Sequence, residues 1–375
     1  MNTQNDAAGR AIAGVGAVAA IGGTATEFFD ALCAGKTGVA ELRRFDTRGY
    51  RTHHGYPMAN RAPDRPAYAT RWLVQTIAEA AAQAGLGDDL AGIPVVVGTG
   101  LRELRSVELA WQAGPEGGSP DLDFGPAIRE RFGCTEVHTV SNACAASLHA
   151  LGMADDLLTL GMADTVVVAG VDTIAVSMFA TLDLVQPPME SLRPFDARHK
   201  GVLMGDGAAA IVLRRDGTAR ARLRGVGITC DASHVTAPDP VGIVAAMHDA
   251  QRRAGVRPTD VDLVLAHGTG TALNDAAEAT ALTNVFGAAR PLVTAIKAMT
   301  GHTSGSSGLL SVVAAVESLR TGQVPPIPDL TTPIAEASPL RLATAPVEPA
   351  ILDIAQVNSF GFGGVNAVAI LEGVS

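Results

Sequence analysis

The sequence predicts an α/β fold in which a parallel or mixed β-sheet is covered by helices on both faces. Short β-branched runs alternate with longer alanine-rich runs that have helical periodicity. The short runs are apolar on both sides, which indicates strands buried between two layers of helices. Glycine is frequent, with 41 residues among 375, whereas aromatic residues make up 4%. This composition favours close packing of small side chains over an all-β sandwich.

Each predicted element has a local signal. The apolar stretch 11–23 is broken by glycines and is too short to span a bilayer, so it predicts a first buried strand and turn rather than a signal or membrane segment. Further strands are predicted at residues 94–98, 165–171, 207–214 and 261–266, and helices at residues 70–84 and 145–160. Their alternation is typical of a layered α/β protein.

The chain contains a weak internal repeat. Residues 95–100 and 263–270 each combine an apolar run with a Gly-Thr-Gly ending. In the second stretch, Ala-His lies between the apolar run and the Gly-Thr-Gly ending. Each is followed by another strand, a turn of small residues and a helix, near Cys144 in the first case and near His302 in the second. A duplicated α/β unit accounts for this pattern.

The boundary between the two copies is expected near residues 215–222, where Arg-Asp-Gly-Thr separates two strand-like runs. No low-complexity linker divides them, so the halves are expected to share an interface. The predicted units are residues 1–217, with Cys144, and residues 218–375, with His267, Lys297 and His302.

The charge pattern argues against a nucleic-acid-binding protein. The formal net charge is −10, and no Lys/Arg-rich run is present. An acidic carrier protein would need a local basic patch, which Arg43, Arg44 and Arg51, or Arg61 and Arg65, could supply. Because most surface arginines are simply solvated, we interpret both groups as ordinary surface residues.

The four cysteines lie far apart and form no CxxC pair. This spacing argues against a zinc site and against a disulfide framework, so no metal is expected. Free thiols fit a reducing cytoplasm. Cys33, Cys134 and Cys230 are expected to be small apolar fillers.

Cys144 differs from the other cysteines in its local context. Residues 137–149 predict a strand, a tight turn of small residues and an amphipathic helix that begins at about Cys144. A thiol at a helix N-terminus meets unpaired backbone N–H groups and the positive end of the helix dipole. Both favour the thiolate, which is the nucleophilic form, and both can hold an oxyanion. Cys144 is therefore the candidate nucleophile.

A histidine follows the strand predicted at residues 261–266. His267 enters a Gly/Thr loop that leads to a helix capped near Asn274 or Asp275. Because α/β proteins bind ligands at strand ends, His267 is a candidate site residue.

A second histidine, His302, lies in turn material rich in glycine, serine and threonine after a strand that ends near Thr294. Lys297 precedes it in a stretch without other charges. We predict that Lys297 is a buried cation, paired with an acidic residue such as Glu278 or Asp206.

The stretch 356–366 contains closely spaced glycines. They permit positive φ angles and close backbone approach, so an N–H group of this loop could complete an oxyanion hole. The loop lacks the GxGxxG spacing of a dinucleotide site. With Cys144, His267, His302 and Lys297, it forms a constellation suited to thiol-based acyl transfer.

Six motifs, in order along nearly the whole chain, resemble the signature elements of β-ketoacyl-acyl-carrier-protein synthases of the elongating type. They lie at residues 142–147, 193–196, 205–207, 267–271, 297–302 and 358–364. The resemblance implies a thiolase-like fold, with two similar halves in an α-β-α-β-α layered sandwich. It also implies a homodimer, or a heterodimer with a ketosynthase-like subunit, and no cofactor, since an acyl carrier protein delivers acyl groups on its phosphopantetheine.

The resemblance also implies roles for the candidate residues. Cys144 would take the acyl chain, and the backbone N–H groups of Cys144 and Phe362 would hold the thioester oxyanion. Phe362 would also be the gating side chain. His267 and His302 would donate hydrogen bonds to the malonyl thioester as CO₂ leaves, and Lys297 would position His302 electrostatically.

Further site residues follow from the same resemblance. The residues expected to bind substrate are Thr269, Thr271, Phe360, Phe362 and Gly363. The residues expected to support the site are Asp275, Glu278 and Asp206.

The chain departs from the family pattern in several places. Only 44 residues separate Thr99 from Cys144, which is shorter than usual, and Ser311 stands where elongating enzymes commonly have an acidic residue. Residues 198–201 and Val365 also differ. Besides a β-ketoacyl synthase, these departures leave open a non-elongating thiol acyltransferase of the same fold and, less favoured, a non-catalytic chain-length partner subunit.

Overall fold

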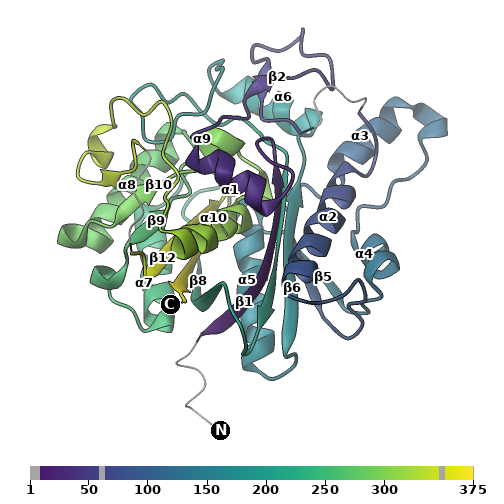
Figure 1. Ribbon diagram of the computed structural model, residues 1–375. Coiled ribbons are helices and arrows are strands. Elements are labelled where there is room, and N and C mark those ends of the chain that lie inside the picture. The colour runs from purple at the N-terminus through teal and green to yellow at the C-terminus, as the bar shows by residue number, and fades with distance from the viewer. Residues whose placement is uncertain (1–8, 59–63, 346–350, 375) are drawn as a thin grey trace.

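The strands form one mixed sheet with helices on both sides (Figure 1). The computed structural model describes residues 9–58, 64–345 and 351–374. The strands of the first half are β1 (Arg10–Ala19), β4 (Val95–Gly98), β5 (Val137–Val140), β6 (Thr165–Asp172) and β7 (Gly207–Arg214). Those of the second half are β8 (Ala221–Cys230), β9 (Leu263–Leu265), β10 (Leu292–Thr294), β11 (Arg341–Leu342), β12 (Ile354–Gly361) and β13 (Val365–Gly373). A separate hairpin consists of β2 (Ala40–Glu41) and β3 (His54–Gly55).

The helices and strands whose ranges were predicted lie within two residues of the observed ones at each end. The helices are α1 (Ala25–Cys33), α2 (Tyr68–Gln83), α3 (Leu104–Gln112), α4 (Gly125–Phe132), α5 (Ala146–Thr159), α6 (Val176–Val185), α7 (Pro240–Ala254), α8 (Ala272–Phe286), α9 (Lys297–Thr300) and α10 (Ser307–Thr321). The expected cap near Asn274 or Asp275 is wrong: α8 is capped by Thr271, whose hydroxyl accepts a hydrogen bond from the Asn274 N–H group. Short 3₁₀ turns precede α5, at Ala143–Ala145, and α10, at Ser304–Ser306. No helix in the described part of the chain is long and apolar enough to cross a membrane.

The two halves repeat one strand arrangement. The order is β5-β4-β6-β7-β1 in the first half and β11-β10-β9-β12-β13-β8 in the second. In each half the inner strand, β4 or β9, is parallel to both neighbours, and β7 or β13 runs antiparallel. Antiparallel pairing of β1 with β8 joins the halves. Because the arrangement repeats, we propose that residues 1–217 and 218–375 are the two units. The boundary between them lies in the connection from β7 to β8.

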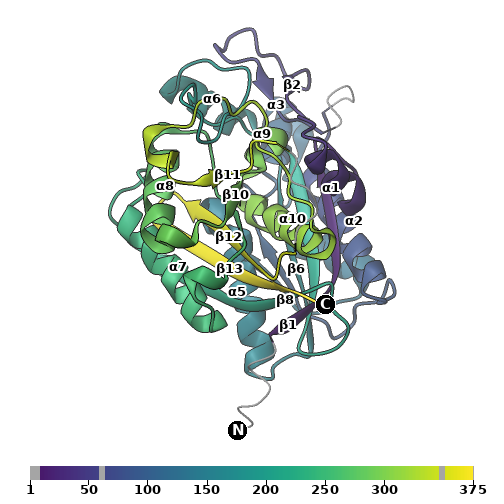
Figure 2. The same cartoon turned by 60° about the vertical axis from the view of Figure 1, so that its left-hand side comes forward.

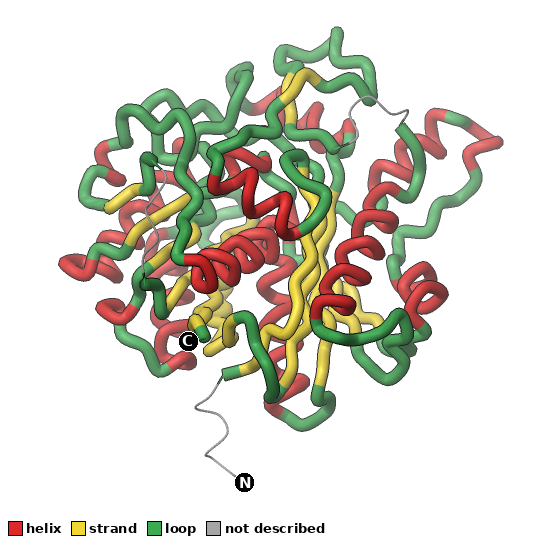
Figure 3. The backbone as a smooth tube through the Cα atoms, viewed as in Figure 1, coloured by secondary structure: helices red, strands yellow, loops and turns green. Residues whose placement is uncertain are grey.

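Five layers are stacked across the molecule. Helix α2 covers the outer face of the first half, where its apolar side chains share a cluster with β4, β6 and β7, and Figure 3 shows this helix beside the strands. Helices α7 and α8 cover the outer face of the second half, which is turned forward in Figure 2. Helices α5 and α10 fill the space between the parts of the sheet that belong to the two halves. The predicted α-β-α-β-α sandwich is therefore confirmed.

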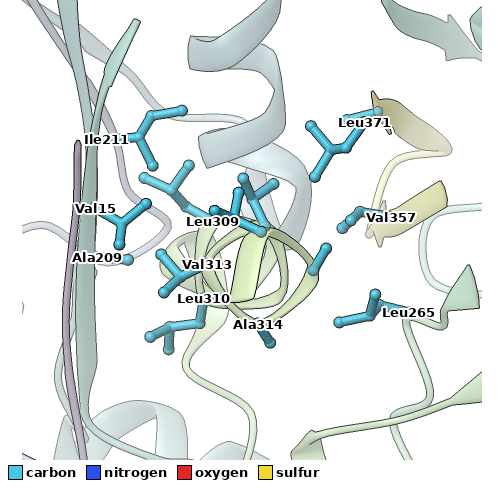
Figure 4. Close-up of a cluster of buried hydrophobic side chains, with 14 of the residues drawn as sticks. Val15, Ala209, Ile211, Leu265, Leu309, Leu310, Val313, Ala314, Val357 and Leu371 are labelled. Atoms are coloured by element: carbon cyan, nitrogen blue, oxygen red, sulfur yellow. The ribbon is translucent and has the colours of Figure 1, made fainter. Parts of the chain in front are cut away.

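Helix α10 forms the centre of the core. Nearly all of its residues are buried, because the helix lies between the two halves of the molecule. Figure 4 shows its side chains between residues of the first half, on the left, and of the second half, on the right. The labelled residues are Leu309, Leu310, Val313 and Ala314 of α10, Val15, Ala209 and Ile211 of the first half, and Leu265, Val357 and Leu371 of the second. Truncating one such leucine to alanine should cost about 2–5 kcal/mol.

The topology brings the carboxyl ends of the parallel strands of both halves to one region. Cys144 follows β5, His267 follows β9, and His302 follows β10 and α9. The two halves contribute to one site, as α/β proteins do at strand ends.

Candidate active site

Cys144 lies in the 3₁₀ turn between β5 and α5. The preceding residue, Ala143, has a φ angle of 47°, a left-handed conformation that is rare for a residue other than glycine. Ser359 of β12 donates a hydrogen bond from Oγ to the Cys144 carbonyl oxygen at 2.8 Å. The strained turn is thus tied to the second half of the molecule.

The two candidate histidines converge on this thiol. His302 Nε2 lies 3.0 Å from Cys144 Sγ. The ring of His267 lies edge to face with that of His302, with centroids 5.5 Å apart. Phe360, which is buried, packs against His267 with the ring centroids 5.6 Å apart. Three residues that lie far apart in the sequence therefore form one cluster.

Lys297 is buried, as the sequence predicts, and its closest contacts are with His267. Lys297 Nζ lies 3.3 Å from His267 Nδ1 and also donates to the His267 carbonyl oxygen. Burial lowers the pKa of Lys297 to about 8, while the charges of Glu278 and Cys144 act in the opposite direction. Its influence on His302 is electrostatic, since its charge helps to lower the pKa of that imidazole.

Glu278 and Asp275 of α8 anchor the loop that carries His267. Glu278 accepts hydrogen bonds from the backbone N–H groups of His267 at 2.7 Å and Gly268 at 2.8 Å. Asp275 accepts from the N–H groups of Gly270 at 3.1 Å and Phe195 at 2.8 Å. Both carboxylates are fully buried, so they fix the backbone around the first histidine.

The prediction that Asp206 could pair with Lys297 is wrong. Asp206 instead accepts a hydrogen bond from Arg44 Nη2 at 3.0 Å, and both side chains are buried. It also accepts from the N–H groups of Ile174 and Met58, each at 2.7 Å. Arg44 is therefore not part of a surface patch: it is the cation that Asp206 requires, because an unpaired carboxylate is costly to bury.

The expectation that the helix N-terminus favours the Cys144 thiolate is also corrected. Burial raises the pKa of the thiol to about 11, and the nearby Asp172 raises it further, although the charge of Lys297 lowers it. Desolvation is the largest influence on this pKa. The cysteine is a thiol at neutral pH and needs a base, for which His302 Nε2 is the adjacent group.

Both histidines are neutral at physiological pH. Burial holds the pKa of His267 well below its ordinary value, and the charges of Lys297 and His302 lower it further. Burial and Lys297 act in the same way on His302. A neutral imidazole can accept a proton at one nitrogen and donate a hydrogen bond from the other. The pair can therefore serve proton transfer as well as hydrogen bonding.

The glycine loop between β12 and β13 lies beside the turn of Cys144. A Cβ atom added to Gly361 would lie 3.2 Å from the Cys144 backbone nitrogen. Phe362 is 58% exposed, and Gly363 has a φ angle of 87°. Thr269 and Thr271 lie in the loop after His267, with their hydroxyl oxygens 2.9 Å apart.

Two further residues of the site were not identified from the sequence. Asp172, at the end of β6, is fully buried and accepts hydrogen bonds from Thr99 Oγ1 at 2.7 Å and Gly305 N at 2.6 Å. Burial raises its pKa to about 6. His199 lies 3.4 Å from Asp275, which raises the pKa of the histidine. A polar residue ending an apolar strand is the one signal that could have identified Asp172.

The remaining cysteines take no part in the cluster. Cys33 is half-buried, Cys134 is buried and Cys230 is exposed, so the prediction of an apolar filler is wrong for Cys230. Within the described ranges, no group of three or more His, Cys, Asp or Glu side chains could hold a metal ion.

Comparison with known proteins shows the family of this chain. The family models for the N-terminal and C-terminal domains of β-ketoacyl synthase match residues 10–219 and 220–331. The 3-oxoacyl-(acyl-carrier-protein) synthase 2 of Coxiella burnetii is 30% identical, over 97% of this chain and 98% of the relative. The protein of the same name from Synechocystis sp. is also 30% identical, over 95% of each chain.

Solved structures of the same kind superpose closely. The ishigamide ketosynthase/chain length factor has a TM-score of 0.89 at 29% identity, covering 98% of this chain and 100% of that one. A β-ketoacyl synthase from Burkholderia phymatum STM815 has a TM-score of 0.86 at 24% identity, with the same coverage. The fold implied by the sequence motifs is confirmed. With a family model across more than half of its length, the chain belongs to the β-ketoacyl synthase family of acyl-transferring condensing enzymes.

Proposed function

We propose that this chain catalyses a decarboxylating condensation in which Cys144 carries the acyl group and His267 and His302 act on the malonyl unit. The observation that carries the proposal is the 3.0 Å contact between Cys144 Sγ and His302 Nε2, with the His267 ring beside it. Carrier-bound thioesters are the substrates, in a fatty-acid-like or polyketide pathway, and the mechanism requires no metal or nucleotide.

In the first step, the Cys144 sulphur attacks the carbonyl carbon of an acyl thioester on the phosphopantetheine of a carrier protein. His302 Nε2 takes the thiol proton as the S–C bond forms and passes it to the departing pantetheine thiolate. The backbone N–H groups of Cys144 and Phe362 hold the oxyanion. The raised pKa of the thiol makes this base necessary at neutral pH.

In the second step, the malonyl thioester loses CO₂ and the electrons of the broken C–C bond form an enolate. Its oxygen accepts a hydrogen bond from His267, and a second from His302 Nε2 once the single proton of that neutral imidazole has moved from Nδ1 to Nε2. The enolate carbon attacks the acyl-Cys144 carbonyl, and collapse of the tetrahedral intermediate breaks the C–S bond. The products are a β-keto thioester on the carrier and a thiolate that regains its proton from water.

Residues on both sides of the thiol would bind the pantetheine chain. Thr269 and Thr271 present hydroxyl groups in the loop after His267. Phe360 lies near the end of β12, and Phe362 and Gly363 follow in the connection to β13. Hydroxyls on one side and apolar or backbone groups on the other suit an arm that contains both amides and methylene groups.

Incubation with carrier-bound substrates tests the reaction. Acyl-carrier alone should add the acyl mass to the protein, and subsequent malonyl-carrier should release CO₂ with a β-keto product. Acyl-Cys144 that forms but passes its acyl group only to an alcohol or amine would favour the non-elongating transferase. Ser311, which is buried on α10 and supplies no carboxylate, is the observation behind that alternative. Absence of any acyl-enzyme would favour the chain-length partner subunit.

A cationic pocket is the proposed docking site for the carrier protein. A pocket of about 410 Å³ is lined by Arg51, His53, His54, Pro188, Met189, Glu190, Ser191, Arg193, Arg198 and Lys200. Four of these residues are permanently basic and one is acidic, although the whole chain has a net charge of −10. The backbone of Arg193 approaches Gly270 in the loop of Thr269 and Thr271. Basic residues concentrated beside the site would attract an acidic carrier.

Only part of the basic patch considered from the sequence contributes to this pocket. Arg51 lines it. Arg43 is exposed and pairs with Glu41 at 3.5 Å, and Arg44 is buried against Asp206. Arg65 is exposed, whereas Arg61 lies outside the described residues.

Charge reversal tests the docking site. Lys200→Glu should raise KM for the acyl-carrier severalfold and leave kcat unchanged, because an exposed charge affects association more than chemistry. Lys36→Glu is the matched control, since Lys36 is also an exposed lysine but does not line the pocket. Equal KM values for both variants would place the carrier elsewhere.

Pairing through β5 is the proposed basis of a dimer. This strand is at the end of the sheet and pairs on one edge with β4, and its side chains are only partly buried. An open strand edge is available for pairing with a second copy or with a ketosynthase-like subunit. The four free thiols support a cytoplasmic location for the assembly.

Thr139→Pro tests the dimer. Glu136 and Val140 use their carbonyl groups towards β4, so by alternation the N–H group of Thr139 faces the open edge and proline removes only that donor. We expect the wild-type chain to be a dimer in light scattering and the variant a monomer with unchanged circular dichroism. A wild-type chain that dimerises only when expressed with a ketosynthase-like subunit would establish the heterodimer.

A further inference from the structure

A chain of buried side-chain amides leads from helix α7 to the active site. Gln251 donates from Nε2 to Gln356 Oε1 at 3.0 Å, and Gln356 donates from Nε2 to Asn358 Oδ1 at 2.9 Å. Asn358 then donates from Nδ2 to Glu278 Oε1 at 3.0 Å. All four residues are 3% exposed or less. Burying a polar group costs free energy unless the group is hydrogen-bonded, so we expect this series of buried amides to serve a function.

The direction of the chain is fixed at its carboxylate end. An ionised carboxylate can only accept hydrogen bonds, so Asn358 must turn its NH₂ group towards Glu278 and its oxygen towards Gln356. Gln356 must then donate its own NH₂ group, and its oxygen requires the NH₂ group of Gln251. The positive ends of all three amide dipoles therefore point towards Glu278, which stabilises its charge.

The charge of Glu278 affects the reacting groups through Lys297 and His267. It raises the pKa of Lys297, which favours the ammonium form. That ammonium donates to His267 Nδ1, so the proton of the neutral imidazole must be on Nε2. The state of Glu278 thus determines which nitrogen of His267 can donate a hydrogen bond to substrate.

We infer that Gln356 and Gln251 are positioning residues for the decarboxylation step: they orient Asn358 so that Glu278 stays ionised, Lys297 stays charged and His267 keeps its proton on Nε2. This inference rests on the proposed condensing function. Neither glutamine belongs to the motifs that resemble the family, and neither makes a hydrogen bond to Cys144 or to the histidines among the described contacts.

The charged and titratable groups that face Glu278 come from several elements. Lys297 approaches from α9 and His267 from the loop after β9, while Asp275 lies one turn earlier on α8 and is itself in contact with His199. Burial raises the pKa of Glu278, the N–H groups of Gly268 and His267 and the Asn358 amide lower it, and Asp275 raises it. Loss of the Asn358 orientation should therefore promote protonation of Glu278.

Two substitutions of Gln356 should shift activity in opposite directions along the pH scale. Gln356→Leu leaves Asn358 free to turn its oxygen towards Glu278, so the acidic limb of malonyl-carrier decarboxylation should move up by about one pH unit. Gln356→Glu has the same shape: its protonated form donates like the amide, but its ionised form can only accept and reverses the chain. Its activity should therefore fall as the pH rises.

The matched control is Gln75→Leu, because Gln75 lies on α2 and its amide donates to the Gly23 carbonyl oxygen at 2.9 Å. Its pH profile should equal that of the wild type. Acylation of Cys144 should be unchanged in all three variants, since the contact with His302 does not involve the amides. An equal loss of loading and decarboxylation at every pH would show a purely structural role and overturn the inference.

The ¹⁵N chemical shifts of His267 separate this inference from the proposed function, since they report the tautomer without turnover. Wild-type protein should show the proton on Nε2, and Gln356→Glu should lose this preference as the pH rises. An unchanged tautomer would overturn the inference even if condensation occurs. A wild-type protein that releases no CO₂ but shows the expected tautomer change would overturn only the proposed reaction.

Discussion

The two central helices begin in the same way but with different chemistry. A 3₁₀ turn precedes α5 at Ala143–Ala145, and another precedes α10 at Ser304–Ser306. The first residue of each turn has a left-handed backbone, with φ angles of 47° and 49°. The second residue is Cys144 in one turn and Gly305 in the other. The two halves thus contain two similar turns, of which only one carries a candidate nucleophile.

The surroundings of each turn explain the difference. Cys144 has room for a side chain that meets His302 from the other half. A Cβ atom on Gly305 would lie 2.4 Å from the Gly100 nitrogen, so a side chain cannot be accommodated there. The Gly305 N–H group instead donates to Asp172. The first turn therefore presents a reactive group, while the second packs against the opposite half and holds it in place.

Removing the reactive side chain of the first turn should have the largest effect. Cys144→Ala keeps the turn but removes the acyl acceptor, so formation of the β-keto product should fall at least about 10⁴-fold. Intact-mass measurement after incubation with acyl-carrier should show no acyl-enzyme. Cys230→Ala, which removes an exposed thiol, is the control and should load normally. Acylation of Cys144→Ala would show that another residue is the nucleophile.

Adding a side chain to the second turn should have the next largest effect. Gly305→Ala places a Cβ atom against the backbone of Gly100, and the resulting strain should lower the free energy of unfolding by about 1–3 kcal/mol. Urea denaturation measures this change. Gly87→Ala is the control, because a Cβ atom there meets nothing within 4 Å. Equal stability of the two variants would contradict the packing of the second turn against the opposite half.

The charge that precedes the second turn should determine the alkaline pH limit of condensation. Because burial lowers the pKa of Lys297 to about 8, its ammonium form and the decarboxylation rate should decline as the pH rises through that value. Lys297→Arg keeps the charge throughout. Its rate at pH 7 should fall about tenfold, since a larger group must fit a packed site, but the alkaline decline should disappear. If the rate of the variant still declines at alkaline pH, a group other than Lys297 is responsible for the titration.

The smallest effect is expected for Phe362, which lies beside the first turn. Its side chain is largely exposed, so Phe362→Ala should change the free energy of unfolding by less than about 0.5 kcal/mol. If the side chain gates access to Cys144, KM for the acyl-carrier should change severalfold. Steady-state kinetics on acyl-carrier and thermal unfolding together measure the two quantities. An unchanged KM for the acyl-carrier would show that Phe362 does not control access of the substrate to Cys144.

Local pattern was sufficient for much of the fold. The apolar runs of β4, β6 and β7 and the alanine-rich runs of α2 and α5 have distinct periodicities, so their positions follow from the sequence to within two residues. Cys144, His267 and His302 were also identified, because each follows a strand and the carboxyl ends of parallel strands gather at one region.

Hydrogen bonds and ion pairs between distant segments could not be predicted from local sequence pattern. The sequence offered Asp206 as a partner of Lys297, but Asp206 pairs with Arg44. It gave no indication of Asp172 as an acceptor for both halves, or of the amides that lead to Glu278. Hydrogen bonds between residues 80 or more positions apart depend on how whole elements pack, and neither periodicity nor motif spacing contains that information.

The sequence by itself determined most strands and helices, in their order along the chain, and which residues are the candidates for the chemistry. The tertiary structure decided their electrostatic states. Helix position alone suggested a Cys144 thiolate, whereas burial in the assembled halves raises the pKa of the thiol to about 11. They likewise make both histidines neutral. Desolvation depends on everything that surrounds a group, and that environment exists only once the two halves have packed together.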